Sequence, residues 1–149
     1  MELYYFSFTG RSKKIAEWIS EHLSIEAKEI KAPHLPYIPW LFLSFIPYLQ
    51  IEAEFEPPSS GRVILCFPKW TFNCPPVTYF INRVDVRELH LVICYGGFDE
   101  GRYANFYRKM VMKRAEKCEY ILVKRRHIDE NPEAVRARIL EWVDNLTNS

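Results

Sequence analysis

The stretch LYYFSFTGRSKKIAEWISEHL, residues 3–23, decides the fold because two hydrophobic patterns of different period meet in it. Its first part, Leu3–Phe8, is a short apolar and aromatic run, which is typical of a buried β-strand. In its second part, apolar residues recur at spacings of three and four, which is typical of an amphipathic helix; they are Ile15, Ala16, Ile19 and Leu23. The stretch therefore predicts a strand that passes through a hydroxyl-rich turn directly into a helix.

The rest of the chain repeats this order of strand and helix. Nearly continuous apolar runs at Arg62–Phe67 and Leu89–Tyr95 are typical of strands that are covered on both faces. Weaker strand patterns lie at 25–30 and 119–123, and helical patterns follow Pro75, Tyr103 and Pro132. This alternation predicts an α/β fold, a three-layer, doubly wound, five-stranded parallel sheet with strand order 2-1-3-4-5. No repeat or linker interrupts it, so we expect one domain over 1–149, with an irregular apolar segment at 32–60.

Composition excludes several classes of function. The 149 residues include 20 Lys and Arg against 19 Asp and Glu, a net charge of +1, which argues against nucleic-acid binding. The basic run at 124–127 is accordingly interpreted as a solvated strand end. The four cysteines form no C-x-x-C pair and the four histidines are dispersed, so we predict no metal site. The N-terminal residues lack the pattern of a signal peptide, so the expected location is cytoplasmic.

The loop SFTGRS, residues 7–12, follows the first predicted strand. Ligands of such sheets bind beyond the carboxyl ends of the strands, and a helix N-terminus offers free N–H groups to an anion. Three hydroxyl groups, one glycine and Arg11 therefore favour a phosphate-binding turn, although an ordinary Ser/Thr-capped helix start is the alternative. The turn lacks the three glycines of a dinucleotide fingerprint, and the chain has no P-loop motif.

Two further loops follow the two strongest strand patterns. The loop 68–76 places Trp70 and Phe72 beyond its strand, where they offer apolar surface to a ligand or else cover the top of the core. The loop 95–101 contains Gly96 and Gly97, which either let the backbone approach a ligand closely or form a tight turn. All three loops lie at one predicted edge of the sheet.

Together the three loops resemble those of the flavodoxin family. SFTGRS, followed by KKIA at 13–16, resembles the flavodoxin phosphate loop; FPKWTFNCPPV at 67–77 and VICYGG at 92–97 resemble the second and third flavin loops. The resemblance implies a flavodoxin-like fold and FMN as the cofactor, with the 5′-phosphate in the first loop. It implies that Trp70 and Tyr95 lie against the flavin and that Gly96 and Gly97 face its pyrimidine edge. The cofactor-binding residues it implies are Ser7, Phe8, Thr9, Gly10, Arg11, Ser12, Pro68, Lys69, Trp70, Thr71, Phe72, Tyr95, Gly96, Gly97 and Phe98, with no separate catalytic residue.

The resemblance implies electron transfer through bound FMN, with a redox partner protein or a small electron acceptor. Two alternatives stay open: an FMN-dependent NAD(P)H-quinone-type reductase, and a flavin-free protein-interaction module on the same fold. The near-zero net charge departs from the strongly acidic surface of electron-shuttling flavodoxins, so docking through an acidic rim is not expected.

The segment APHLPYIPWLFLSFIPYLQI, residues 32–51, carries no formal charge. Its length would allow a membrane span, but Pro36, Pro39 and Pro47 each remove a backbone donor, so we expect none. One interpretation is a displaced second helix whose aromatic residues cover the flavin edge. A homodimer surface through 35–51 or a substrate lid is the next alternative, because exposed apolar patches mark interfaces, and shallow membrane contact is the third.

Overall fold

Five parallel strands form the central sheet, in the order β2-β1-β3-β4-β5, in the computed structural model, which describes residues 1–149. The central strand β3 pairs with β1 on one side, where Leu3 lies opposite Ile64, and with β4 on the other, where Phe67 lies opposite Ile93. The predicted α/β fold and strand order are therefore confirmed. The strands are β1 (Glu2–Tyr5), β2 (Ala27–Glu29), β3 (Arg62–Pro68), β4 (Glu88–Tyr95) and β5 (Tyr120–Lys124).

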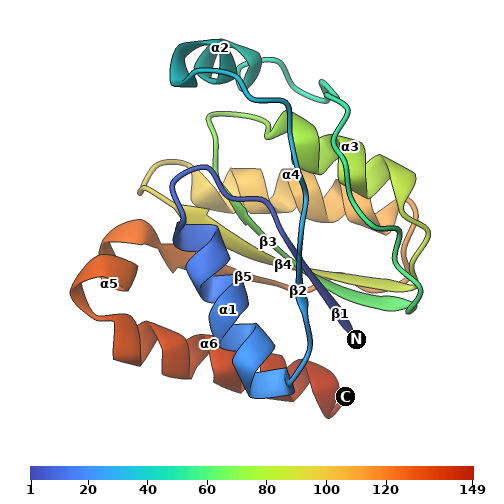
Figure 1. Ribbon diagram of the computed structural model, residues 1–149, viewed down its shortest axis with the longest axis vertical. Helices are drawn as coiled ribbons and strands as arrows, with labels where there is room; N and C mark the ends of the chain where they lie inside the picture. The colour runs from blue at the N-terminus through green and yellow to red at the C-terminus, as the bar shows by residue number, and fades with distance from the viewer.

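Helices cover both faces of this sheet, as Figure 1 shows. On one face lie α1 (Arg11–Leu23), α5 (Arg125–Glu130) and α6 (Pro132–Thr147); on the other lie α3 (Pro75–Arg83) and α4 (Glu100–Met112). Proline stands in the first turn of α3 and of α6, where its missing N–H leaves no hydrogen bond unmade. None of the helices combines the length and apolar character needed to cross a bilayer.

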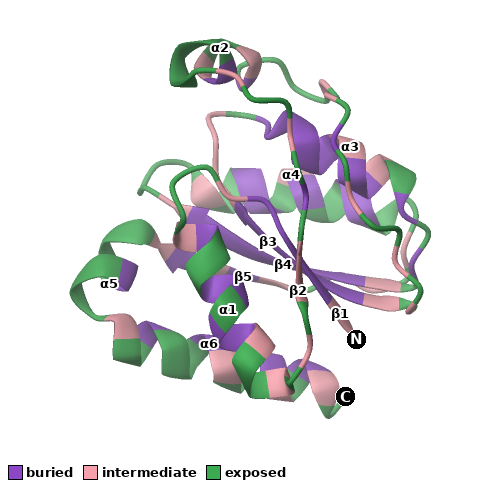
Figure 2. Ribbon diagram, in the orientation of Figure 1, coloured by how far each residue is buried: buried purple, intermediate pink, exposed green.

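The core consists of two apolar layers, one on each face of the sheet. Successive side chains of a strand point to opposite faces, so in β3 Leu65 and Phe67 pack against α3 and α4, whereas Ile64 and Cys66 pack against α1 and α6. Figure 2 shows the strands buried along most of their length. This two-sided burial is the physical reason for the nearly continuous apolar runs of β3 and β4.

The remaining helix, α2 (Tyr37–Leu43), lies beyond the carboxyl ends of the strands, apart from both helical layers (Figure 1). It falls within the segment 32–60 that the sequence predicts to be irregular. Proline at its N-cap position begins the helix, and Ser44 ends it. Its inward residue, Trp40, is buried, whereas most of its other side chains are exposed (Figure 2).

Two further boundaries differ from those expected. The first strand is predicted to reach Phe8 but ends at Tyr5; the Phe6 N–H still donates to the Cys66 carbonyl at 2.9 Å, and the chain then bends over residues 8–10. At the other end of the chain, only Lys124 of the basic run belongs to a strand. The next three residues begin α5, which forms because Ile128 in its second turn is fully buried against the sheet.

Candidate functional site

The turn between β1 and α1 leaves the first N–H groups of the helix free of partners in the helix. The N-cap residue Gly10 has φ +95°, a conformation that glycine adopts without steric cost, and no side chain caps the helix. The Gly10 N–H donates to Ser7 Oγ at 3.0 Å, and the first intrahelical bond runs from the Lys14 N–H to the Gly10 carbonyl at 3.0 Å. The N–H groups of residues 11–13 therefore present positive partial charge at the helix end.

Hydroxyl and guanidinium groups surround this helix end. Ser12 is almost fully buried, and no hydrogen bond within the chain engages its hydroxyl. Arg11 forms a two-point ion pair with Asp129 of α5, with Nη2–Oδ2 at 2.8 Å and Nε–Oδ1 at 3.3 Å, and donates weakly to Thr9 Oγ1 at 3.4 Å. The hydrogen bond from Arg11 holds the pKa of the Asp129 carboxyl below its ordinary value. Much of the Arg11 charge is thus balanced within the chain.

The loop after β3 brings Lys69 and Trp70 to the same edge of the sheet. Trp70 packs edge-on against Phe6 and Phe8, at 5.4 and 6.0 Å between ring centroids, and lies at a tilt against Trp40 of α2 at 5.4 Å. Burial lowers the pKa of Lys69. The carboxylates of Asp99 and Glu100 partly offset this lowering, and the nearby positive charge of Arg125 adds to it. An aromatic wall and a partly buried ammonium group therefore face the turn at the end of β1.

Two buried polar residues fasten α2 to this loop. The Ser44 carbonyl accepts hydrogen bonds from the N–H groups of Phe72 and Asn73, both at 3.0 Å. The Asn73 side-chain amide donates to the carbonyls of Ile46 and Leu49 at 3.0 and 2.9 Å, and its oxygen accepts from the hydroxyls of Thr78 and Tyr107. Because Asn73 is fully buried, these bonds satisfy polar groups that would otherwise be costly to leave unpaired.

The loop after β4 borders α5, where Gly96 shares a surface hollow with Arg11, Arg125 and Asp129. Tyr95 is half-buried, and Gly96, Gly97 and Phe98 are exposed. A Cβ atom at Gly96 would meet the guanidinium of Arg125, so the glycine lets the end of this flexible side chain lie directly against the backbone. The third loop therefore packs against the start of α5.

A pocket of about 170 Å³ lies where the first two loops, α2 and α5 meet. Arg11, Lys69 and Arg125 line it, and no carboxylate does. Of the three, Arg11 pairs with Asp129 and Lys69 donates to the Thr71 carbonyl at 3.4 Å, whereas the Arg125 side chain makes no ion pair or hydrogen bond within the chain. The full set of lining residues is Ser7, Phe8, Thr9, Arg11, Ser12, Tyr37, Trp40, Leu41, Ser44, Pro68, Lys69, Trp70, Thr71, Cys94 and Arg125.

The structure thus brings together most residues that the sequence indicates in the first two loops. Of the third loop, none of Tyr95, Gly96, Gly97 and Phe98 lines the pocket, and only the preceding Cys94 does so. Burial raises the pKa of the Cys94 thiol to about 12, which makes it a core thiol rather than a nucleophile.

Sequence reasoning missed Arg125, and it offered a displaced helix beside the ligand edge only as one interpretation of the segment 32–51, without naming the residues that line the pocket. The lining residues Tyr37, Trp40, Leu41 and Ser44 come from the uncharged segment 32–51, whose four prolines hide any helical period. Arg125 belongs to the basic run that was predicted to be a solvated strand end. Its position directly after a parallel strand was the available signal, because every such strand ends at the ligand-binding edge.

The residues present fit a phosphate ester attached to a flat aromatic group. The free N–H groups of α1, the Ser12 hydroxyl and the three cations suit a dianion, and the aromatic wall suits a ring. The pocket is smaller than the ~300–1,000 Å³ of sites that surround a drug-sized ligand. It would therefore enclose the phosphate end of such a ligand and leave the remainder at its mouth, near the exposed Phe8 and Tyr37.

Comparison with known proteins gives one relative with high sequence identity and several solved structures with the same fold. The chain is 53% identical to an uncharacterized protein of Archaeoglobus fulgidus over 145 residues, covering 96% of this chain and 98% of the relative. A crystal structure described as that of a candidate flavoprotein from Bacteroides eggerthii has a TM-score of 0.73 at 16% identity, covering 98% of this chain and 96% of that one.

A second crystal structure, of a candidate flavoprotein from Bacteroides uniformis, has a TM-score of 0.67 at 14% identity, covering 96% of this chain and 97% of that one. No protein-family model matches the chain. At these identities the two structures show the fold alone, and that fold is flavodoxin-like.

Proposed function

From the premise that the chain belongs to one family with the Archaeoglobus fulgidus protein and has the flavodoxin-like fold, we propose that it binds FMN and serves in electron transfer. The observation that carries the proposal is the pocket at the N-terminus of α1. It combines free backbone donors, three cations and an aromatic wall at the edge of the sheet where this fold binds ligands.

The first loop and the cations would bind the phosphate group of FMN. A dianion at the end of α1 meets the N–H groups of residues 11–13, the Ser12 hydroxyl and the unpaired guanidinium of Arg125. Hydrogen bonds to charged groups contribute about 1.5–3 kcal/mol each, so a few of them separate FMN from riboflavin by orders of magnitude in affinity. Arg11 would contribute less, because Asp129 already balances its charge.

The aromatic residues would position the ring system. Trp70, Phe8 and Tyr37 present flat apolar surface at the mouth of the pocket. Trp40 packs against the Trp70 ring and so restricts its orientation. A bound flavin supplies the redox chemistry, while the protein determines its position and the polarity of its surroundings. The partner in electron transfer would be a redox protein or a small acceptor.

Titration with FMN and with riboflavin tests this proposal. The two ligands share the ring and differ in the phosphate, so we expect FMN to bind at least tenfold more tightly and to raise the melting temperature. Equal affinity for both would mean that the pocket holds no phosphate. Binding of neither would favour a flavin-free interaction module on the same fold.

A second candidate is an FMN-dependent NAD(P)H-quinone-type reductase. The observation that favours it is that residues of α2 line the pocket, since a residue such as Tyr37 would then cover a small substrate bound beside the flavin. Adding NAD(P)H alone to the FMN-loaded protein separates the two functions. The reductase would bleach the flavin absorbance directly, whereas the electron carrier would need a partner protein.

A further inference from the structure

Exposed large hydrophobic side chains are concentrated on one part of the surface. Ten such residues are exposed in the chain, and nine of them lie on α2 or on the loops around it. The tenth, Met112, ends α4 at the opposite end of the sheet. The nine, whose exposed fractions run from 42% to 76%, form what we call the aromatic face: Phe8, Tyr37, Ile38, Phe42, Phe45, Ile46, Tyr48, Phe72 and Phe98.

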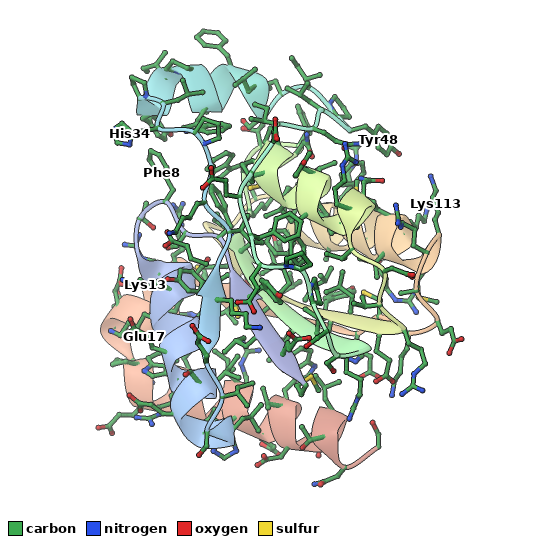
Figure 3. All side chains as sticks on the ribbon, turned by 45° about the vertical axis from the view of Figure 1, so that its right-hand side comes forward. Phe8, Lys13, Glu17, His34, Tyr48 and Lys113 are labelled. Carbon is green, nitrogen blue, oxygen red and sulfur yellow. The ribbon has the colours of Figure 1, made fainter.

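The aromatic face is continuous around α2. At one end of the helix Phe8 lies 6.1 Å from Tyr37 between ring centroids, and at the other Phe45 lies 5.7 Å from Phe72. Figure 2 shows the outer side of α2 exposed along its length, and Figure 3 shows Phe8 below one end of the helix and Tyr48 beyond its other end. Phe98 is linked to the loop that carries Phe72 through Lys69, whose Nζ lies 5.8 Å from the Phe98 ring and donates to the Thr71 carbonyl.

The area of the aromatic face matches that of a stable protein interface. Aromatic side chains expose about 150–250 Å² each when free, so nine large residues that are about half exposed present on the order of 1,000 Å². A standard interface buries about 800 Å² on each partner. Patches of this size are rare on the surfaces of soluble monomers, and aromatic residues are enriched where proteins meet.

The distribution of charge indicates which partner fits. Residues 32–51, which supply six of the nine members, contain no Lys, Arg, Asp or Glu, and the charged residues that border the face are of both signs, with Lys69 against Phe98, Lys113 against Tyr48, and Asp99 beside Phe72. The face therefore offers no charge complement to a strongly acidic or basic partner and no basic cluster for an anionic bilayer. A two-fold contact, by contrast, brings a patch against its own copy and is favoured when that patch carries no like charges. The net charge of +1 also leaves two copies with little mutual repulsion.

We infer that the aromatic face binds a second copy of this chain, forming a two-fold dimer through α2 and its flanking loops. Phe8 and Tyr37 belong both to this face and to the lining of the pocket. A second copy would therefore border the mouth of the pocket. The inference rests on exposure, area and charge, and it stands independently of whether the pocket binds FMN.

Sedimentation of the full chain over a range of concentrations, without added cofactor, tests the inference. We expect a reversible dimer for the natural sequence and at least a tenfold higher dissociation constant for Phe42→Glu. Because Phe42 is 69% exposed, this substitution should leave the melting temperature of the monomer unchanged. Ile38→Glu, on the same face, provides a second variant, and Met112→Glu is the matched control outside it.

Dissociation caused by both variants on the face, with a dimer retained in Met112→Glu, would support the inference. A natural chain that is monomeric at every concentration would overturn it. A dimer that persists in Phe42→Glu and Ile38→Glu would also overturn it, and so would a dimer that Met112→Glu dissociates as well. A monomer that floats with vesicles of phosphatidylglycerol would assign the face to a membrane surface instead and would equally overturn it.

Discussion

The indole rings of Trp40 and Trp70 lie 5.4 Å apart between centroids, tilted by 46°. Trp40 comes from α2 and Trp70 from the loop after β3, so this contact joins the uncharged segment to one of the loops predicted to bind a ligand. Ser44 and Asn73 hold the same two parts of the chain together by hydrogen bonds. The helix α2 is therefore a structural wall of the candidate site.

The hydroxyl groups of the first loop should distinguish FMN from riboflavin. Replacing Thr9 and Ser12 together with Ala removes two donors near the end of α1, and we expect the dissociation constant for FMN to rise tenfold or more while that for riboflavin changes little. Fluorescence titration with both ligands measures the difference. An equal loss for the two ligands would show that the loop does not hold a phosphate.

Arg125 should contribute more to FMN affinity than its neighbour in sequence. Arg125→Gln removes a cation of the pocket that makes no ion pair within the chain, so we expect roughly tenfold weaker FMN binding and a smaller effect of added salt on it. Arg126→Gln is the matched control, because Arg126 lies outside this pocket and pairs with Glu130 at 3.2 Å. Equal effects of the two substitutions would mean that Arg125 acts only through the net charge of the protein.

Asn73 should stabilise the attachment of α2. Asn73→Ala leaves the carbonyls of Ile46 and Leu49 and the hydroxyl of Tyr107 without this partner, which should lower the free energy of unfolding by about 2–4 kcal/mol. Asn82→Ala is a suitable control, since Asn82 is only half-buried and donates to a carbonyl of its own helix. Denaturant unfolding measures both, and the same small loss in each would contradict the role given to Asn73.

His90 should make stability depend on pH. The ring is fully buried in β4, its Nδ1 accepts the Glu119 N–H at 3.1 Å, and its Nε2 has no partner. Burial lowers the pKa of His90, an effect that Lys117 and Arg62 reinforce and that Glu88 and Glu119 only partly offset.

The unfolded chain therefore takes up a proton near pH 6.5 that the folded chain does not. We expect the free energy of unfolding to fall by up to about 1.4 kcal/mol for each pH unit below this value, until the lowered pKa of the folded state is reached. His90→Gln should remove this slope, and His34→Gln, at an exposed position, should keep it. Equal slopes in the natural chain and in His90→Gln would contradict the assignment.

The layers of the fold were predictable because the spacing of hydrophobic residues along each segment indicates whether it forms a strand or a helix and which side it buries. The buried runs at 62–67 and 89–95 indicated strands covered on both faces, and right-handed crossovers then left few arrangements of the sheet. The first two loops were predictable for a related reason, since the carboxyl ends of parallel strands always share one edge. The hydroxyl and aromatic residues of those loops line one pocket, except Phe72, which packs against Phe45 outside it.

The remaining features depend on contacts between residues far apart in sequence. The position of α2 depends on the buried amide of Asn73, which donates to the chain that follows the helix. The hydrophobic pattern of the sequence gives no sign of such a contact. Arg11 pairs with Asp129, which is 118 residues away in sequence. Arg125 lies against Gly96, so the loop after β4 packs on α5 instead of lining the pocket. The helix α5 carries a single buried residue, Ile128, which is too weak a signal for prediction.

The absorbance spectrum of the freshly purified protein, before and after addition of FMN, tests the central claim most directly. We predict the visible bands of oxidised flavin, either as purified or after FMN is added and the unbound ligand is removed by gel filtration. A protein that stays colourless after that treatment, with a melting temperature unchanged by FMN, would contradict the claim that this pocket binds the cofactor.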